Sequence, residues 1–174
     1  MAPETFLAWE AEQLDRYELV DGWPYAMVGA GRVHEEVAGA IFAVLWTHLE
    51  GNPCRAYKGD RKVQVGTDFF YPDVVVTCDT EDRSVDGPIK APVAIVEVIS
   101  RPTAAYDRRE KYERYISLPS LEVYLIVDPE HRQVERYERA SGWVRQELGP
   151  AEPISIVAIG FSCPQQRIFA ALEA

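Results

Sequence analysis

The sequence feature that most constrains the fold is an apolar run with a single carboxylate inside it, VAIVEVI at positions 93–99. A continuous apolar run of this length is typical of a strand that is buried on both faces. Burying an isolated carboxylate is costly, so Glu97 must be protonated, paired or bound to a metal. Alternatively, Glu97 lies at an exposed strand end, or Arg101 or Lys111 neutralises it. The run therefore predicts a core strand that carries a candidate functional residue.

The clearest helix in the pattern begins after a glycine-rich loop at 29–31. Apolar residues recur at helical spacing from Val33 to Leu49, over about four turns. Gly51 and Pro53 follow as stop signals. Further helices are predicted at 4–14, at about 104–118 and at 167–173.

Alternating and continuous apolar runs, bounded by turn residues, predict the strands. The predicted strands are 17–20, 23–28, 54–58, 61–66, 70–77, 93–99, 122–128, 132–139 and 153–159. Hairpin turns are predicted at Asp21-Gly22 and at Ser141-Gly142. The polar segment from Asp79 to Lys90 is predicted to be a loop.

The order of these elements indicates a mixed architecture. Strands come in runs, and one helix connects strand 93–99 to strand 122–128, which is how parallel neighbours are joined. We therefore predict an α+β (mixed α/β) fold with a central mixed sheet flanked by helices and extra hairpins toward both ends. The chain has 174 residues and no linker or repeat, so a single domain over 1–174 is expected.

Cysteine usage and hydropathy bear on the cellular compartment. Cys54, Cys78 and Cys163 lie far apart and form no C-x-x-C pair. We expect neither a disulfide framework nor structural zinc, which favours a reducing cytoplasm. No apolar run reaches the roughly 18 residues that would span a bilayer. The N-terminal segment lacks the basic region of a secretory signal. A cytoplasmic location without a membrane partner is predicted.

The formal net charge of -10 bears on nucleic-acid binding. Phosphate backbones attract basic surfaces, so an acidic protein binds them poorly unless its charge is locally segregated. The sequence contains two clusters of basic residues. They are Arg55, Lys58, Arg61 and Lys62, and Arg108, Arg109, Lys111 and Arg114.

A second carboxylate, Asp73, opens the apolar run at 74–76 and follows Pro72. Proline cannot donate to a sheet, so it marks an edge, a bulge or a strand start, where active-site residues are often found. Alternatively, Asp73 caps its own backbone. On neighbouring strands, Asp73 and Glu97 would form a site of hard oxygen ligands that suits Mg²⁺ or Mn²⁺. Such an ion activates water and stabilises charge on a phosphodiester.

Three further residues are candidates, each with a simpler interpretation. Lys111 lies on the helix after Glu97, where it could reach the metal site or form a surface ion pair with Asp107. His34, at a helix start, could contact phosphate or be a partly exposed helix-start residue. Glu18 could approach the metal, but a solvated strand face is the simpler expectation.

The order of several segments resembles the Uma-two (Uma2) family of endonucleases in the restriction-endonuclease-like PD-(D/E)XK superfamily. The resemblance covers roughly residues 5–140. Its segments are YELVDG (17–22), the His34 helix, YPDVVV (71–76), VEVIS (96–100), the set Thr103, Asp107, Lys111 and Tyr115, and VYLIVDP (123–129).

This resemblance implies a four-stranded mixed core sheet flanked by helices, with the metal held by an Asp and a Glu on adjacent strands. Asp73 matches the PD position and Glu97 the (D/E) position. The chain departs from the superfamily at Ile99, where a lysine is usual. Lys111, in the following helix, fits the slot that such a lysine takes in the Uma2 branch.

The leading hypothesis is a Mg²⁺-dependent DNA endonuclease that acts as a homodimer, with strands and hairpin 122–148 as candidate interface. Asp73, Glu97 and the main-chain carbonyl of Val98 would bind the metal, and Lys111 would orient the nucleophile. One alternative is a weakly active or inert binding or dimerisation module. Another is a metal-dependent hydrolase of a small phosphorylated substrate. A basic rim would favour DNA, and a closed acidic pocket the small substrate.

Overall fold

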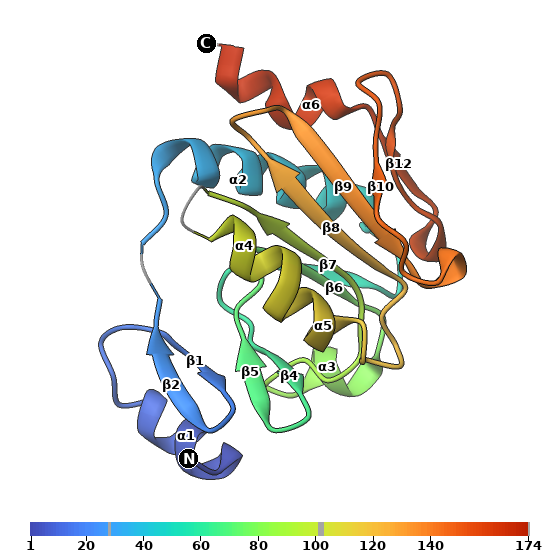
Figure 1. The fold of residues 1–174 in the computed structure, drawn as a ribbon. Helices are drawn as coiled ribbons and strands as arrows, with labels where there is room; N and C mark the ends of the chain where they lie inside the picture. Colours follow the sequence, from blue (N-terminus) through green and yellow to red (C-terminus); the bar gives the residue numbers. More distant parts are fainter. Residues whose placement is uncertain (28, 101–102, 174) are drawn as a thin grey trace.

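A six-stranded mixed sheet forms the centre of the computed structural model, which describes residues 1–27, 29–100 and 103–173 (Figure 1). In spatial order the strands are β10 (Gln146–Glu147), β9 (Gln133–Glu138), β8 (Val123–Asp128), β7 (Pro92–Val98), β6 (Val74–Thr77) and β3 (Arg55–Lys58). The β7–β8 pair is parallel, as predicted, and the other neighbours are antiparallel. The predicted mixed sheet is confirmed, with six strands instead of four.

Two smaller antiparallel sheets accompany it. The first is made of β2 (Trp23–Ala26), β1 (Tyr17–Val20), β5 (Asp68–Phe70) and β4 (Val63–Val65), in that order. The second is made of β11 (Ile154–Ile156) and β12 (Phe161–Cys163). The first contains the hairpin predicted at Asp21-Gly22, whereas the one predicted at Ser141-Gly142 joins β9 to β10 in the central sheet.

The described residues also contain six α-helices and three short 3-10 helices, Arg139–Ser141, Val157–Ile159 and Ala170–Glu173. The α-helices are α1 (Pro3–Glu10), α2 (Arg32–His48), α3 (Thr80–Ser84), α4 (Ala104–Tyr106), α5 (Tyr112–Tyr115) and α6 (Gln165–Phe169). A π-helical turn, Asp107–Lys111, joins α4 to α5, so the helix predicted at 104–118 is one continuous element. Within the described ranges, none of these helices has the length and apolar character needed to cross a membrane.

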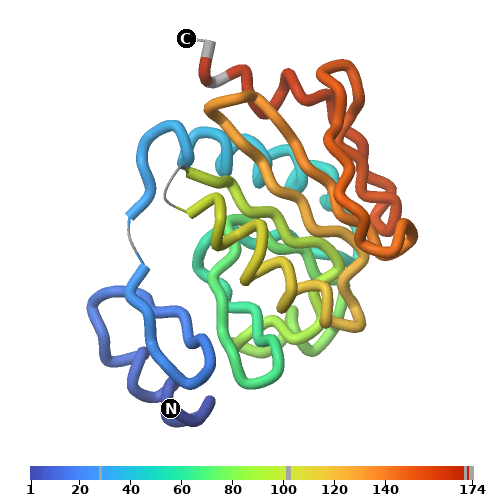
Figure 2. The backbone as a smooth tube through the Cα atoms, in the orientation of Figure 1, coloured from blue at the N-terminus to red at the C-terminus, as the bar shows by residue number. Residues whose placement is uncertain are grey.

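Helices cover both faces of the central sheet, which is why β7 is apolar apart from Glu97. On one face, Val37, Ile41 and Leu45 of α2 pack in the same cluster as Val96. On the other, the segment from α4 to α5 packs in the cluster that contains Ile95. Figure 1 shows α2 behind the sheet and α4–α5 in front. Figure 2 shows the N-terminal segment at the bottom of the view and the C-terminal segment at the top.

Two predicted boundaries are wrong in an informative way. The strand predicted at 70–77 is interrupted at Pro72, where the chain leaves the sheet of β5 and enters the sheet of β6. The predicted loop from Asp79 to Lys90 contains α3, because the Asp79 side chain caps its first turn.

The prediction that the cysteines remain unpaired is also wrong. Cys54 and Cys78 form a disulfide. The antiparallel register pairs Arg55 with Thr77, so the next residues outward face each other. Sequence spacing cannot reveal this proximity.

Two residues named in the sequence predictions lie outside the described residues. They are Val28, in a predicted strand, and Arg101, a possible partner of Glu97.

Candidate active site

Asp73 and Glu97 face each other at one end of the central sheet. The β6–β7 register pairs Val74 with Val96, so Asp73 lies opposite Glu97 and both side chains project to the same face. Both line one cleft of about 540 Å³, together with His34, Val98 and Lys111. The prediction that both carboxylates line one cleft is therefore confirmed, and their sharing of a metal stays a prediction.

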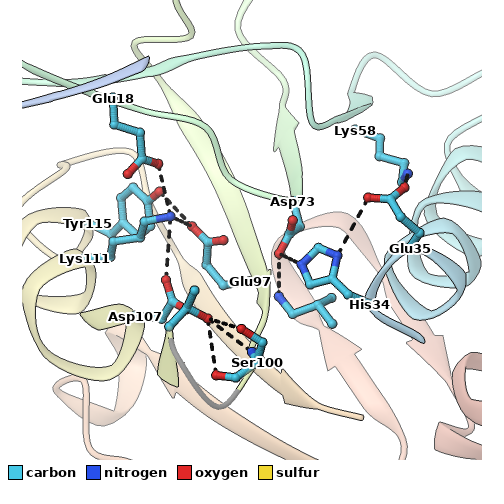
Figure 3. Close-up of polar contacts among 12 residues, drawn as sticks. Glu18, His34, Glu35, Lys58, Asp73, Glu97, Ser100, Asp107, Lys111 and Tyr115 are labelled. Carbon is cyan, nitrogen blue, oxygen red and sulfur yellow. Dashed lines mark hydrogen bonds and ion pairs between the residues drawn. The ribbon is translucent and has the colours of Figure 1, made fainter. Parts of the chain in front are cut away.

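Lys111 enters this cleft from the π-helical turn and is buried there (Figure 3). Its Nζ lies 3.0 Å from Glu97 Oε1, 3.1 Å from Glu18 Oε1 and 3.6 Å from Asp107 Oδ1. The pairing with Asp107 was the simpler interpretation, but it is the longest of the three contacts. Lys111 is thus a buried cation at the centre of a carboxylate cluster. π-Helical turns of this kind are frequent at functional sites.

Glu18 is buried, and the expectation of a solvated strand face is wrong. Besides its contact with Lys111, its Oε1 accepts a hydrogen bond from the backbone N–H of Tyr71, 3.0 Å away. The segment between β5 and β6 therefore closes over Glu18. A four-residue strand gives too short a pattern to show which face is covered.

Tyr115, on α5, fixes the orientation of Glu97. Its hydroxyl donates to Glu97 Oε1 over 3.0 Å, and its ring is fully buried. Tyr115 belongs to the set of residues that carry the family resemblance, and packing within its helix was the simpler interpretation. Its buried contact with Glu97 gives it a positioning role.

His34 lies at the first turn of α2, beside Asp73. Its Nε2 is 3.1 Å from Asp73 Oδ2, which also accepts a hydrogen bond from the Val98 N–H over 2.7 Å. The other ring nitrogen, Nδ1, is buried without a hydrogen-bond partner, and Glu35 Oε1 lies 3.8 Å from it. The predicted position of His34 beside the cleft is observed.

The charges of this cluster determine its protonation. Burial raises the pKa of Glu97 well above its usual range; Lys111 opposes this, and Asp107, Asp73 and Glu18 reinforce it. Burial lowers the pKa of Lys111, but Glu97, Glu18 and Asp107 outweigh it and raise the pKa. One ammonium is thus shared by several carboxylates, and the neighbouring negative charges favour the protonated form of Glu97.

The pKa of His34 is also raised. Burial of the ring lowers it, and the hydrogen bond and charge of Asp73 more than offset that effect. The shift favours the protonated ring, in which both nitrogens are donors.

The donor set fits a hydrated hard cation. No group of three His, Cys, Asp or Glu side chains is arranged to hold a metal in residues 1–27, 29–100 and 103–173. Mg²⁺ keeps several waters and commonly needs only one or two protein carboxylates. Asp73 and Glu97, which line the same cleft, meet that requirement. The role of the Val98 carbonyl stays a prediction.

The basic residues predicted to attract DNA are largely engaged in ion pairs. Lys58 pairs with Glu35 and Lys62 with Glu10, at 2.6 and 2.8 Å. Arg108 pairs with Glu135 at 2.6 Å. These two clusters therefore do not form a free basic rim.

Comparisons with known proteins agree with this fold. The family model Uma2, described as "Putative restriction endonuclease", matches residues 3–166. The Synechocystis sp. (strain PCC 6803) protein slr1290 is 32% identical over 176 residues, covering 99% of this chain and 93% of that protein. A second Synechocystis protein, sll1609, is 25% identical over 150 residues, covering 82% and 84%. Both relatives carry the name "Uncharacterized protein".

A solved structure matches as well. The crystal structure of a "putative nuclease belonging to DUF820" from Anabaena variabilis ATCC 29413 superimposes with a TM-score of 0.84. It covers 99% of both chains at 14% sequence identity, which supports the fold alone. The match confirms the predicted restriction-endonuclease-like architecture. Since the family model spans residues 3–166, this chain belongs to the Uma2 family.

Proposed function

We propose that this protein is a Mg²⁺-dependent endonuclease that hydrolyses phosphodiester bonds in DNA. The observation that carries the proposal is the juxtaposition of Asp73 and Glu97 on one cleft beside the buried Lys111. Carboxylates and a lysine arranged in this way suit metal-assisted hydrolysis of a phosphodiester. Membership of the Uma2 family supports the same reaction class.

Asp73 and Glu97, with the main-chain carbonyl of Val98, would hold the Mg²⁺, or Mn²⁺ in its place. A bound ion of this kind lowers the pKa of a coordinated water and offsets charge on the phosphate. Burial and the neighbouring carboxylates disfavour the ionised form of Glu97, and a divalent cation bound there would favour it.

Lys111 would orient the attacking water and offset the charge of the pentacovalent phosphorane. Its ammonium stays charged because three carboxylates surround it, and Nζ lies within hydrogen-bond distance of Glu97. Glu18 and Asp107 hold the lysine from the other sides, which limits its rotamers. Such preorganisation lowers the cost of reaching the reactive geometry.

His34 would contribute a donor to the scissile phosphate. Asp73 occupies its Nε2, and the raised pKa favours a proton on Nδ1. Displacement of the Glu35 side chain, which lies next to Nδ1, would open this N–H to a phosphate oxygen.

We also propose that the protein acts as a homodimer. One cleft cuts one strand, so cleavage of both strands of DNA by a site of this kind needs two copies. Within the predicted interface at 122–148, β8 is interior and buried. The edge strand β10, the hairpin that precedes it and the exposed β8–β9 turn at 130–132 are accessible to a second copy. Light scattering at high micromolar concentration tests this proposal, and a monomer would refute it.

The test of activity is an assay on supercoiled plasmid and single-stranded DNA with Mg²⁺ or Mn²⁺. The wild type should cleave, whereas Asp73→Asn and Glu97→Gln should lose most of the activity. Glu113→Gln is the matched control, since Glu113 is an exposed carboxylate on the helix that follows Lys111. Equal cleavage by the wild type and Asp73→Asn would refute the proposal.

A further inference from the structure

A second cavity, of about 530 Å³, adjoins the proposed catalytic cleft. Its lining comes from the β1–β2 hairpin on one side and from the segment of α4 and the π-helical turn on the other. The two cavities share Met27, Thr103, Asp107 and Lys111 as lining residues. A polymer bound in the cleft would therefore have direct access to the second cavity. We call it the aromatic pocket, after Tyr25 and Tyr106 in its lining.

The aromatic side chains of this pocket are not explained by the core. Tyr25 is 56% exposed, on the edge strand of its sheet. Met27, at the junction of the two cavities, is 38% exposed. Tyr106, on α4, also lines the pocket, and Lys111 Nζ lies 5.8 Å from its ring centroid. Large apolar surfaces exposed next to a catalytic cleft are typical of ligand contacts.

The charge of the pocket selects the kind of group that can enter. Its cations already have partners: Lys111 binds Glu18, and Arg114, behind the lining, binds Asp21 and Glu110. At the mouth of the cleft, Arg16 pairs with Asp60. These ion pairs engage one oxygen of each of three lining carboxylates, namely Glu18 Oε1, Asp21 Oδ2 and Glu110 Oε2. The acids outnumber the cations in the lining, which disfavours a phosphate. The pocket suits a flat heterocycle that stacks on tyrosine and donates N–H groups to carboxylates.

An unpaired nucleobase has that chemistry, and a base inside an intact duplex does not present it. Stacking on aromatic side chains is the usual means of holding single-stranded nucleic acid, because every base has a π-face. Adenine, cytosine and guanine carry exocyclic amines that can donate to carboxylates, whereas thymine has no such group. In this geometry the base enters the pocket and its phosphate stays in the cleft.

We infer that the aromatic pocket binds an unpaired base next to the scissile phosphate, so that the substrate is single-stranded or locally unpaired DNA. The inference rests on the proposed nuclease function and specifies its substrate class. It also explains how a chain with a formal net charge of -10 could bind DNA, since base stacking would supply part of the affinity that a basic groove otherwise provides.

The test measures binding without cleavage, using the full-length protein in EDTA. Fluorescence anisotropy would compare a labelled single-stranded oligodeoxynucleotide, the same strand with abasic positions, and the matching duplex. The single strand should bind about tenfold more tightly than either of the others. Tyr25→Ala should weaken single-strand binding by about tenfold, and Tyr25→Phe should retain it because the stacking face remains.

Trp23→Ala is the matched control, because Trp23 is 70% exposed on the same strand but is not in the pocket lining. It should bind like the wild type. Duplex binding as tight as single-strand binding, no binding to any of the three probes, or an unchanged affinity in Tyr25→Ala would overturn the inference.

The plasmid assay separates this inference from the proposed function. Cleavage that requires Asp73 but not Tyr25 would support the nuclease proposal and refute the role of the aromatic pocket in base binding. Binding that requires Tyr25, without any metal-dependent cleavage, would support the base-binding pocket and refute the nuclease proposal.

Discussion

Lys111 and Glu97 are 14 residues apart in the chain, and their Nζ and Oε1 atoms form a buried ion pair of 3.0 Å. The pair joins the core strand β7 to the π-helical turn that packs over it. Glu18 and Asp107 complete the surroundings of the ammonium. Removing the lysine would leave three carboxylates facing one another in a buried position.

Lys111→Met is therefore predicted to affect both stability and activity. The free energy of unfolding at neutral pH should fall by about 3 kcal/mol, because buried carboxylates lose their cation. The loss should shrink as the pH falls. The pKa of Glu97 is already raised by burial, and Lys111 opposes that rise, so removing the lysine raises the pKa further and makes ionisation of Glu97 at higher pH more costly to the folded state.

Urea denaturation at several pH values measures this effect, and the plasmid assay measures cleavage, which should be largely lost. Arg109→Met provides the control, since Arg109 is exposed on the same turn. If Lys111→Met cleaved like the wild type, the catalytic role of the lysine would have to be abandoned.

Tyr115→Phe tests the positioning of Glu97. The change removes one hydroxyl that donates to Glu97 Oε1 over 3.0 Å and leaves the buried ring in place. We expect a loss of about 1–2 kcal/mol in unfolding free energy and a fall in kcat, with little change in KM. Tyr112→Phe removes a hydroxyl that donates to the Trp143 carbonyl over 2.9 Å, away from the cleft. Equal kcat values for the two variants would assign Tyr115 a purely structural role.

Metal binding should be detectable without any substrate. Mn²⁺ or Mg²⁺ at a saturating concentration should raise the melting temperature of the wild type, because a ligand that binds only the folded state stabilises it. Asp73→Asn and Glu97→Gln should show little or no increase, and Glu113→Gln should behave like the wild type. A similar increase in all four proteins would place the metal outside the Asp73–Glu97 cleft.

The parts of this site that sequence predicts are those with a strong local signal. Glu97 is recognisable because a carboxylate inside a long apolar strand must be protonated, paired or bound to a metal. Asp73 follows Pro72, which marks the strand start. The position of Lys111 follows from the number of helical turns between the end of β7 and this residue. In each case the position follows from one element and its immediate neighbour.

Features that depend on contact between distant segments are not predictable in this way. Glu18 is buried because residues near Tyr71 close over it, and a four-residue strand carries no sign of that cover. The Cys54–Cys78 pair follows from the register of two strands. The ion pairs that neutralise Lys58 and Arg108 also depend on tertiary packing, so a linear cluster of basic residues overstates the free positive charge.

The buried carboxylate of Glu135 offers a test of acid stability away from the cleft. Its side chain accepts hydrogen bonds from Arg108 Nε at 2.8 Å, Arg145 Nε at 2.9 Å and Tyr137 Oη at 3.0 Å. Burial raises the pKa of Glu135, but these hydrogen bonds and the charge of Arg108 outweigh it and lower the pKa. Ionised Glu135 therefore stabilises the fold fully above the unfolded-state pKa of about 4.3, and this contribution is lost as the pH falls through the lower folded-state pKa.

Glu135→Gln should consequently reduce the unfolding free energy by about 2 kcal/mol at neutral pH, since it weakens hydrogen bonds to a buried charged group. The difference from the wild type should stay constant down to about pH 4.3 and then decrease, because protonation removes the same contribution from the wild type.

Glu147→Gln is the control. Glu147 also pairs with Arg145, at 3.5 Å, but its side chain is 53% exposed, so the change in unfolding free energy should be within about 0.5 kcal/mol. A difference between Glu135→Gln and the wild type that persists unchanged to pH 2 would show that the charge of Glu135 does not contribute to stability. Cleavage by Glu135→Gln should match the wild type at neutral pH, because Glu135 does not line the catalytic cleft.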